Sequence, residues 1–229
     1  MSTNTSIQGD TRDQIIRAAE ELFAARGIDG VSLREINRAA GQSNTGAVQY
    51  HFGDREGLVT AIIMKHRRDT EPRRHALLDM YEDAGVPDMR ALASALVSPA
   101  AAKLADPDGG RSYLQLSAEY YTRPSRMPNR APLIKPNDSI VRWHALLDPL
   151  VPAEERAVLH TRYPAIRFCF VELARRAAGE PREDDRLFTS HLTDLVTALL
   201  DATPSASTTR LLAQREEDGD DPEGGLATS

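Results

Sequence analysis

The sequence is poor in the residues that form disulfides and membrane spans. Cys169 is the single cysteine among 229 residues, which excludes an internal disulfide framework and a cysteine-rich metal site. No stretch approaches the roughly 20 consecutive apolar residues of a membrane-spanning helix. The first residues, MSTNTSIQGD, have neither the charged nor the apolar region of a secretion signal. We therefore expect a soluble protein of the reducing cytoplasm, without a membrane partner.

Strand-forming patterns are also missing. Aromatic residues make up only 5% of the chain, and β-branched residues do not alternate with polar ones over any run. Ala, Leu, Arg and Glu dominate instead, and apolar residues recur at helical spacing. The predicted fold class is all-α.

Residue patterns that carry enzyme chemistry are absent as well. There is no Gly-rich phosphate loop, no HExxH pair and no activated nucleophile. Cys169, between two phenylalanines on an apolar helix, is expected to be a buried structural thiol. His66 and His75 have arginine neighbours and no third ligand at metal-binding spacing, so we expect surface residues. We expect no cofactor, no metal and no enzyme; a small helical enzyme is the least favoured alternative.

The helical pattern divides the chain into short and long segments. The first four predicted helices lie before residue 85, and a region interrupted by prolines follows at 85–137. We expect a disordered arm at 1–10, an extended loop at 123–136 and an acidic disordered tail at 204–229 with a short turn at 209–213. Helices are predicted at 11–26, 32–40, 44–50, 54–80, 88–104, 111–122, 137–148, 152–178 and 184–202.

Capping side chains mark the starts of the early helices. Thr11 and Ser32 each stand three residues before a Gln or Glu, which is the spacing of a capping box. Ser43 and Asp54 are placed to cap the third and fourth helices. Only Gly41 and Gln42 separate the second helix from Ser43.

Two short helices joined by a tight turn form a helix-turn-helix pattern over residues 32–50. The second helix of such a motif fits the major groove of DNA, which is about 12 Å wide. Val48 and Phe52 provide an apolar inner face, and Asn44, Thr45, Gln49 and Tyr50 an outer hydrogen-bonding face. Gln49 is the best candidate for a base contact, because its amide can pair with adenine through two hydrogen bonds.

The full string SLREINRAAGQSNTGAVQYHFGDREGLV, preceded by IIRAAEELFAARGIDGV, resembles the N-terminal domain of the tetracycline-repressor (TetR) family over residues 11–64. The resemblance implies that Ser32, Tyr50, His51 and Arg55 contact phosphates; Arg55 replaces a common lysine. Gly46 departs from a good helix former, and it is expected to weaken the third helix by about 1 kcal/mol relative to alanine. The predicted DNA-binding residues are Ser32, Asn44, Thr45, Gly46, Gln49, Tyr50, His51 and Arg55.

The resemblance also implies a homodimeric repressor that binds a palindromic operator in double-stranded DNA and is released by a small-molecule effector. A regulator of the same fold without a small-molecule effector is the alternative. We expect DNA binding at 11–55 and effector binding with dimerisation at 56–203. The last two long helices would form the dimer interface through their apolar residues, Val158, Ile166, Phe170, Leu173, Leu187, Leu192, Leu195, Val196 and Leu199.

Effector-binding residues are harder to predict, because binding cavities are mostly apolar with few polar groups. Among the large residues of the central helices we select Tyr120, Trp143 and Phe168 as candidates to line the cavity.

The charge distribution is compatible with DNA binding although the net charge is −6. Residues 204–229 hold two arginines against six acidic residues, which leaves a net charge of −2 for the rest. Five basic residues lie within 65–74, and two interpretations are open: the solvated face of a long helix, or a positive contribution near DNA.

Overall fold

The computed structural model is built from α-helices, and no strand occurs in the part of the chain that it describes. It describes residues 3–44, 46–85, 88–122, 135–152, 156 and 162–217. Two 3₁₀ turns, η1 (Ala102–Ala105) and η3 (Asp148–Leu150), follow α5 and α7. The helices are α1 (Thr3–Arg26), α2 (Leu33–Ala39), α3 (Ala47–Phe52), α4 (Arg55–Asp83), α5 (Met89–Ala101), α6 (Gly110–Thr122), α7 (Ser139–Leu147), α9 (Arg162–Ala178), α10 (Arg186–Leu200) and α11 (Ala206–Glu217). The predicted all-α class is confirmed.

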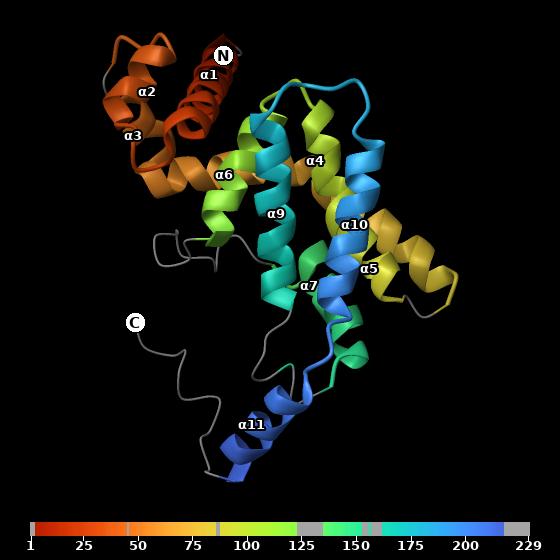
Figure 1. Cartoon of the computed structure of the whole chain (residues 1–229). Helices are drawn as coiled ribbons and strands as arrows, with labels where there is room; N and C mark the ends of the chain where they lie inside the picture. Colours follow the sequence, from red (N-terminus) through yellow and green to blue (C-terminus); the bar gives the residue numbers. More distant parts are fainter. Residues whose placement is uncertain are drawn as a thin grey trace.

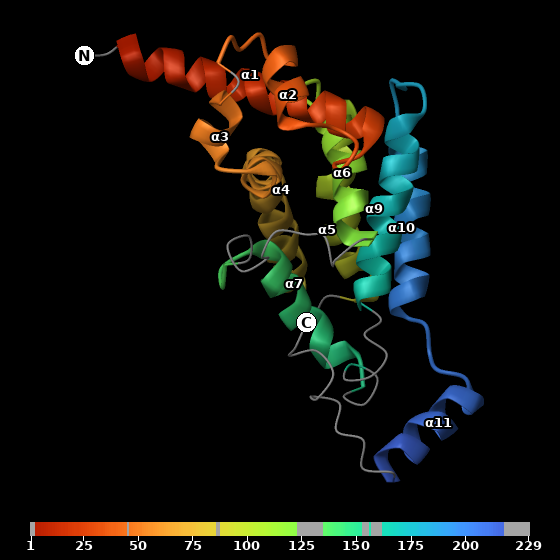
Figure 2. The same ribbon diagram turned by 90° about the vertical axis from the view of Figure 1, so that its left-hand side faces the viewer.

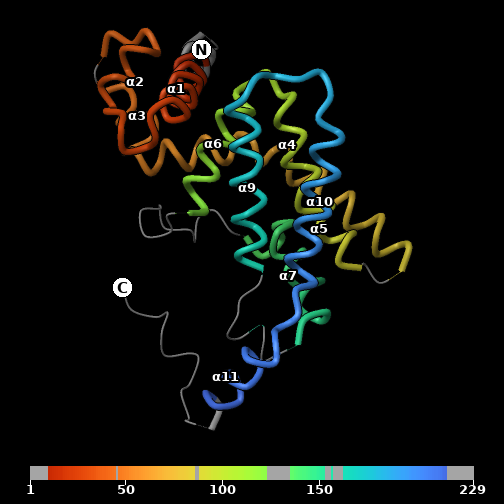
Figure 3. The backbone as a smooth tube through the Cα atoms, viewed as in Figure 1, coloured from red at the N-terminus to blue at the C-terminus, as the bar shows by residue number. Residues whose placement is uncertain are grey.

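The helices form an N-terminal group and a larger C-terminal bundle (Figures 1 and 3). α1, α2 and α3 gather at one end, and α4 leads from them into the bundle. There α6 packs along α9 and α5 packs along α10. Figure 2 shows α9 and α10 side by side along the edge of the molecule opposite α3, with α11 set apart beyond them.

Two apolar clusters hold this arrangement together. The first joins α1, α2 and α3 to the start of α4 through fully buried residues such as Ile15, Ile36 and Ile62. The second fills the bundle around Leu96 and Leu173. The helix α6 contributes to both, because Leu116 and Tyr120 belong to the first cluster and Tyr113 and Leu114 to the second. The N-terminal group is therefore packed against the bundle through α6 as well as through α4.

The first helix is longer than predicted. It begins at Thr3, so the expected disordered arm at 1–10 is wrong for residues 3–10. No proline occurs between Thr3 and Thr11, and the helix continues upstream through this stretch. Thr11 is therefore inside the helix and does not cap it, and the Gln14 amide donates instead to the Asp10 carboxylate at 3.2 Å.

The predicted disordered tail also contains a helix, α11. Residues 206–217 hold no Gly or Pro and several strong helix formers. Ser205 accepts a hydrogen bond from the Thr208 amide at 3.3 Å, the geometry of an N-cap. Composition alone was a poor guide here because a polar, well-capped helix resembles a disordered segment in its amino-acid content. The rest of the tail, 218–229, and nearly all of the predicted loop at 123–136 lie outside the described residues.

The basic run at 65–74 is mostly engaged in contacts within the chain. Arg74 is buried, and it donates to the Ala95 carbonyl at 3.1 Å and to Ser139 Oγ at 2.8 Å. Arg67 pairs with Asp138 at 2.6 Å and so joins α4 to the start of α7. The sequence leaves open a solvated helix face or a positive contribution near DNA. Neither describes Arg67 and Arg74, because both bind residues that are distant in the sequence. His66 is also buried, with 1% of its surface exposed, so the expected surface position is wrong.

Cys169 is fully buried in the C-terminal bundle, as predicted. Burial raises the pKa of its thiol to about 12, against a smaller opposing effect of the positive charge of Arg74. The thiol is therefore protonated at neutral and mildly alkaline pH, where only a thiolate would be nucleophilic.

We predict that Ellman's reagent will not react with the native protein at mildly alkaline pH. One thiol per chain will react once denaturant unfolds the bundle, because unfolding returns the pKa of Cys169 to its ordinary range. Absorbance of the released thiolate measures both reactions. Rapid labelling of the folded chain would contradict the burial of Cys169.

Candidate nucleic-acid interface

The helix α2 begins with the capping box that the sequence predicts. The Ser32 hydroxyl oxygen accepts from the Glu35 amide at 3.3 Å, and Glu35 accepts from the Ser32 amide at 2.8 Å. Arg26 at the end of α1 donates to the same carboxylate at 2.9 Å. The Ser32 amide first, and then Arg26 and the Ser32 hydroxyl, lower the pKa of Glu35 to about 2. Glu35 therefore stays ionised from neutral to mildly acidic pH and fixes α2 to the end of α1.

The turn after α2 positions α3. Gly41 has φ +67°, a conformation that glycine adopts without strain, and it ends α2. Asn44 accepts from the Gly46 amide at 2.9 Å and closes a local turn. The helix α3 begins only at Ala47, so the predicted start at 44 is wrong, and its N-cap is Gly46 rather than Ser43. Gly46 precedes the helix and does not weaken its interior.

A buried side chain of α2 holds the start of α3. Gly46 provides no capping side chain, so the first amides of α3 need other partners. The Asn37 side chain, 1% exposed, accepts from the Val48 amide at 3.1 Å. Asn37 is not among the residues predicted from the sequence, although a polar residue on the inward face beside Ile36 is a signal for such a contact.

The outer face of α3 presents two of the predicted DNA-binding residues. Ala47 and Val48 are buried, whereas Gln49 is exposed and Tyr50 has 74% of its surface exposed. His51 is half-buried, and its ring lies edge-on to the Tyr50 ring with centroids 5.0 Å apart. The polar groups of Gln49 and Tyr50 are thus offered to solvent on a six-residue helix.

The other predicted DNA-binding residues lie around α3. Ser32 and Asn44 are exposed, and Gly46 is partly exposed beside them; Thr45 lies outside the described residues. Arg55 lies at the first position of α4, and its guanidinium donates to the Ile28 carbonyl in the connection between α1 and α2. Asp54 caps α4 as predicted, accepting from the Gly57 amide at 2.8 Å. Arg55 therefore also braces the loop that precedes α2.

The candidate effector-binding residues lie in the two apolar clusters. Tyr120 is buried in the first, and Phe168 is partly buried against the second. Trp143 is fully buried, and its indole N–H donates to the Leu92 carbonyl at 2.7 Å. That these three residues line an effector-binding cavity remains a prediction.

A separate cleft of about 1260 Å³ lies between α5 and α10, and none of these three residues lines it. Hydroxyl groups of Ser94, Ser98, Thr189 and Thr193 are among its walls. Charged residues of 182–186 and Arg90 lie at the same cleft, and Arg90 also pairs with Asp194.

Comparison with known proteins identifies the N-terminal group. Residues 15–62 match the sequence model of the bacterial regulatory proteins of the tetR family. This range runs from the middle of α1 to the first part of α4, and so includes the whole helix-turn-helix.

Curated relatives of this chain include transcriptional repressors. The HTH-type transcriptional repressor AcnR of Corynebacterium glutamicum is 38% identical over 53 residues, which cover 23% of this chain and 28% of that protein. An HTH-type transcriptional repressor of Mycobacterium tuberculosis is 32% identical over 114 residues, 47% of this chain and 59% of that protein. The chain thus spans just over a quarter of the length of the AcnR repressor.

One solved structure is described as the molecular basis for control of antibiotic production by bacterial hormones. The alignment covers 86% of this chain and 97% of the chain in that structure. Its TM-score is 0.45, with 20% sequence identity. The match over residues 15–62 is the more specific finding, because it falls on the residues that build α2, the turn and α3. Over these residues the chain matches the tetR family of bacterial regulatory proteins.

Proposed function

We propose that this chain is a homodimeric transcriptional regulator that binds a palindromic operator in double-stranded DNA and acts as a ligand-released repressor. The observation that carries the proposal is the exposed pair Gln49 and Tyr50 on α3, whose opposite face is fixed by Val48 and Asn37. A short helix held in this way can enter the major groove with its polar face forward. The repressor names of the curated relatives support the direction of regulation.

The two apolar clusters support the assignment of separate functions to two parts of the chain. We assign DNA binding to residues 11–55, and effector binding and dimerisation to 56–203. The first cluster also includes Leu58, Val59 and Ile62 of α4, so the start of α4 supports the DNA-reading helices. No helix of the described residues is both long and apolar enough to cross a membrane.

Exposed apolar side chains on α9 and α10 are the evidence for the proposed dimer interface. Five of the residues predicted at the interface fill the chain's own core instead, because they lie on the inward faces: Ile166, Phe170, Leu173, Leu192 and Val196. Leu199 packs partly buried against that core, and Val158 lies outside the described residues. Leu187 is 86% exposed, and Leu195, Val171 and Tyr163 are 37%, 40% and 43% exposed. A second copy on this face would remove these side chains from water.

We predict that a DNA fragment from upstream of the chain's own gene will bind the purified dimer, with affinity that falls log-linearly as salt rises. Each neutralised phosphate releases counterions, so the slope reports the number of phosphate contacts. Fluorescence anisotropy over a salt series measures it. No binding to this or neighbouring upstream DNA, even at low salt, would contradict the proposed function.

We predict that Gln49→Ala and Tyr50→Phe will affect DNA binding differently. Gln49→Ala removes a base contact and should lower discrimination at one base pair by about 1–3 kcal/mol while random DNA binds as before. Tyr50→Phe removes only a hydroxyl at a phosphate, so operator and random DNA should weaken alike. Both side chains are exposed, and thermal unfolding should stay near wild type. Equal loss on both DNAs for Gln49→Ala would refute its assignment as a base-reading residue.

We predict that Leu187→Glu will convert the dimer into monomers, because it places a charge within the proposed apolar contact. Light scattering after size-exclusion chromatography gives the mass. The matched control is Leu211→Glu on α11, where the leucine is also exposed, at 63%. Loss of the dimer in the control alone would place the interface on α11 and refute the assignment to α9 and α10.

We predict that a small-molecule effector will raise the midpoint of thermal unfolding through mass action and weaken DNA binding at the same concentration. A screen in which compounds alter neither quantity would favour the regulator without a small-molecule effector.

A further inference from the structure

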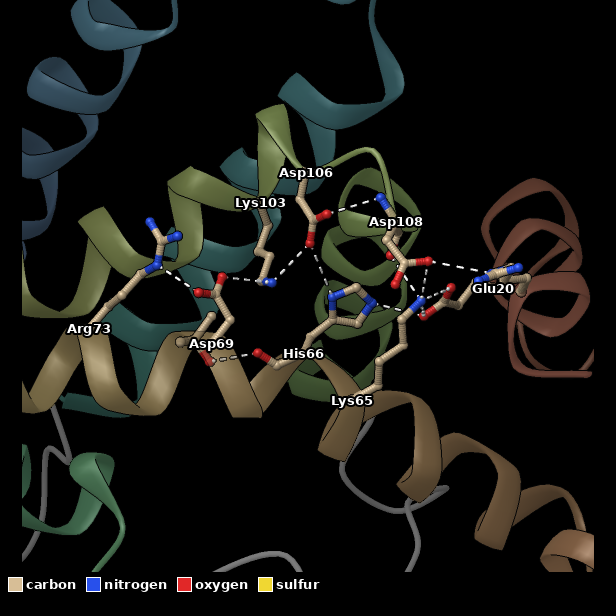
Figure 4. Close-up of polar contacts among 10 residues, drawn as sticks. Glu20, Lys65, His66, Asp69, Arg73, Lys103, Asp106 and Asp108 are labelled. Atoms are coloured by element: carbon tan, nitrogen blue, oxygen red, sulfur yellow. Dashed lines mark hydrogen bonds and ion pairs between the residues drawn. The ribbon is translucent and has the colours of Figure 1, made fainter. Parts of the chain in front are cut away.

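A carboxylate of the DNA-reading part is buried inside the junction with the bundle. Glu20 of α1 has 1% of its surface exposed. His66 Nε2 lies 2.8 Å from Glu20 Oε1, and Lys65 Nζ lies 3.0 Å from Glu20 Oε2. Both partners belong to α4, and Figure 4 shows them facing α1. Glu20 therefore ties α1 to the middle of α4 through charge-assisted hydrogen bonds.

A tight turn of the bundle closes over the same carboxylate. This turn, residues 106–110, joins η1 to α6. Lys65 Nζ donates to the Asp108 carbonyl at 2.9 Å, so one ammonium binds both Glu20 and the turn. Gly109 has φ +81°, and a Cβ atom there would lie 2.2 Å from Glu20 Oε2. Only glycine allows the backbone of the turn to lie so close to Glu20.

Glu20 is one member of a row in which acidic and basic side chains alternate (Figure 4). On one side the row continues through Lys65 to Asp108, 3.0 Å apart. On the other side His66 Nδ1 lies 3.8 Å from Asp106, which Lys103 binds at 2.9 Å. Lys103 reaches Asp69 at 2.9 Å, and Arg73 binds the same aspartate at 2.8 Å. The row thus links α1, α4, η1 and the turn.

Hydrogen bonds within the row favour the charged forms of Asp69, Asp108 and Lys103. A hydrogen bond from Lys103 lowers the pKa of Asp69, and one from Lys65 lowers that of Asp108. Burial alone would lower the pKa of Lys103, yet its bonds with Asp106 and Asp69 raise it above the ordinary value. An interruption of the row would leave buried charges without partners, which is strongly unfavourable.

This polar junction differs in kind from the apolar contacts beside it. Leu116 and Tyr120 of α6 also pack against the N-terminal group, but apolar surfaces are non-directional and tolerate small displacements. A buried ion pair with fixed hydrogen bonds does not tolerate such displacements. Withdrawal of Glu20 from this junction would break both hydrogen bonds and require water to replace them.

We propose that Glu20, Lys65, His66 and the turn 106–110 form a latch that holds α1, and with it the DNA-reading helices, in one orientation relative to the bundle. The latch opens when the turn moves away and Glu20 becomes hydrated. This inference rests on the proposed function for its consequence in DNA binding, but the latch itself is a property of the free protein.

The 3₁₀ turn η1 connects the latch to the cleft between α5 and α10. Ala102, Leu104 and Ala105 line that cleft. Lys103, between them, belongs to the row, and Asp106 follows directly. A molecule that displaces η1 from the cleft side would therefore pull on Lys103 and Asp106.

The test uses the close approach of Gly109 to Glu20. Gly109→Ala in the full-length protein should force Glu20 out, and amide exchange in α1 and α2 should rise about tenfold, within the range for directly coupled neighbours. Exchange in α5, α9 and α10 should stay unchanged. Gly85→Ala is the matched control, since Gly85 also has positive φ (+128°) but nothing within 4 Å of an added Cβ.

The background at position 20 separates the latch from backbone strain. In Glu20→Gln the side chain keeps its size but loses its charge, so exchange in α1 and α2 should already be raised and Gly109→Ala should add less than in the wild type. In Glu20→Ala the clash is absent, and Gly109→Ala should add no more than Gly85→Ala does. Equal effects of Gly109→Ala in all three backgrounds would overturn the proposal, and so would a uniform rise of exchange throughout the protein.

The consequence for DNA is measured on the fragment that the wild type binds. Gly109→Ala should weaken this binding about tenfold when it leaves about one chain in ten latched, because the apparent affinity falls with the binding-competent fraction. If exchange responds as expected and affinity does not, the latch does not control DNA binding and the proposal fails. If the wild type binds no DNA, the proposed function fails, while the exchange experiment still decides whether the latch exists.

Discussion

A six-residue helix cannot keep its shape by itself, and this constraint explains the construction of the N-terminal end. Helix nucleation costs more than one and a half turns return, so α3 depends on contacts from outside. Val48 and Ala47 are buried against the first cluster, and Asn37 binds an amide that no cap would satisfy. Ser32, Glu35 and Arg26 fix α2, which carries Asn37. The surface that we propose binds DNA is therefore only as ordered as the helices behind it.

The same dependence extends into the bundle through α6. Leu116 and Tyr120 complete the first cluster, while Tyr113 and Leu114 on the same helix belong to the second. The Glu119 side chain also accepts from the Ile28 amide, at 3.1 Å, in the connection after α1. The first helix is consequently held by α4 along one side and by α6 along the other. A change in the bundle that reaches α6 or η1 acts on α1 directly, without passing along the whole of α4.

The sequence predicts the features that local interactions decide. The Ser32 capping box and the Asp54 cap join residues three apart, and both are confirmed. The helical class and the helix-turn-helix follow from periodicity in the same way. What could not be predicted depends on distant partners: Val48 finds Asn37 across 11 residues, and His66 finds Glu20 across 46. A histidine among arginines looks solvated until the carboxylate that buries it is known. The apolar residues on the inward faces of α9 and α10 are wrongly predicted at a dimer surface for the same reason. Their spacing shows that one face of each helix is buried, but not whether it is buried within the chain or against a second copy.

The place of the single tryptophan has a consequence for optical spectroscopy. Trp143 is fully buried and bonded to the Leu92 carbonyl, and it belongs to the second apolar cluster, that of the bundle. Its emission therefore reports the packing of the bundle alone. The N-terminal group can loosen or come apart while this signal stays constant, whereas far-ultraviolet dichroism loses the helices of both parts. The lag between the two signals would give the stability of the DNA-reading end separately from that of the rest, without any added label.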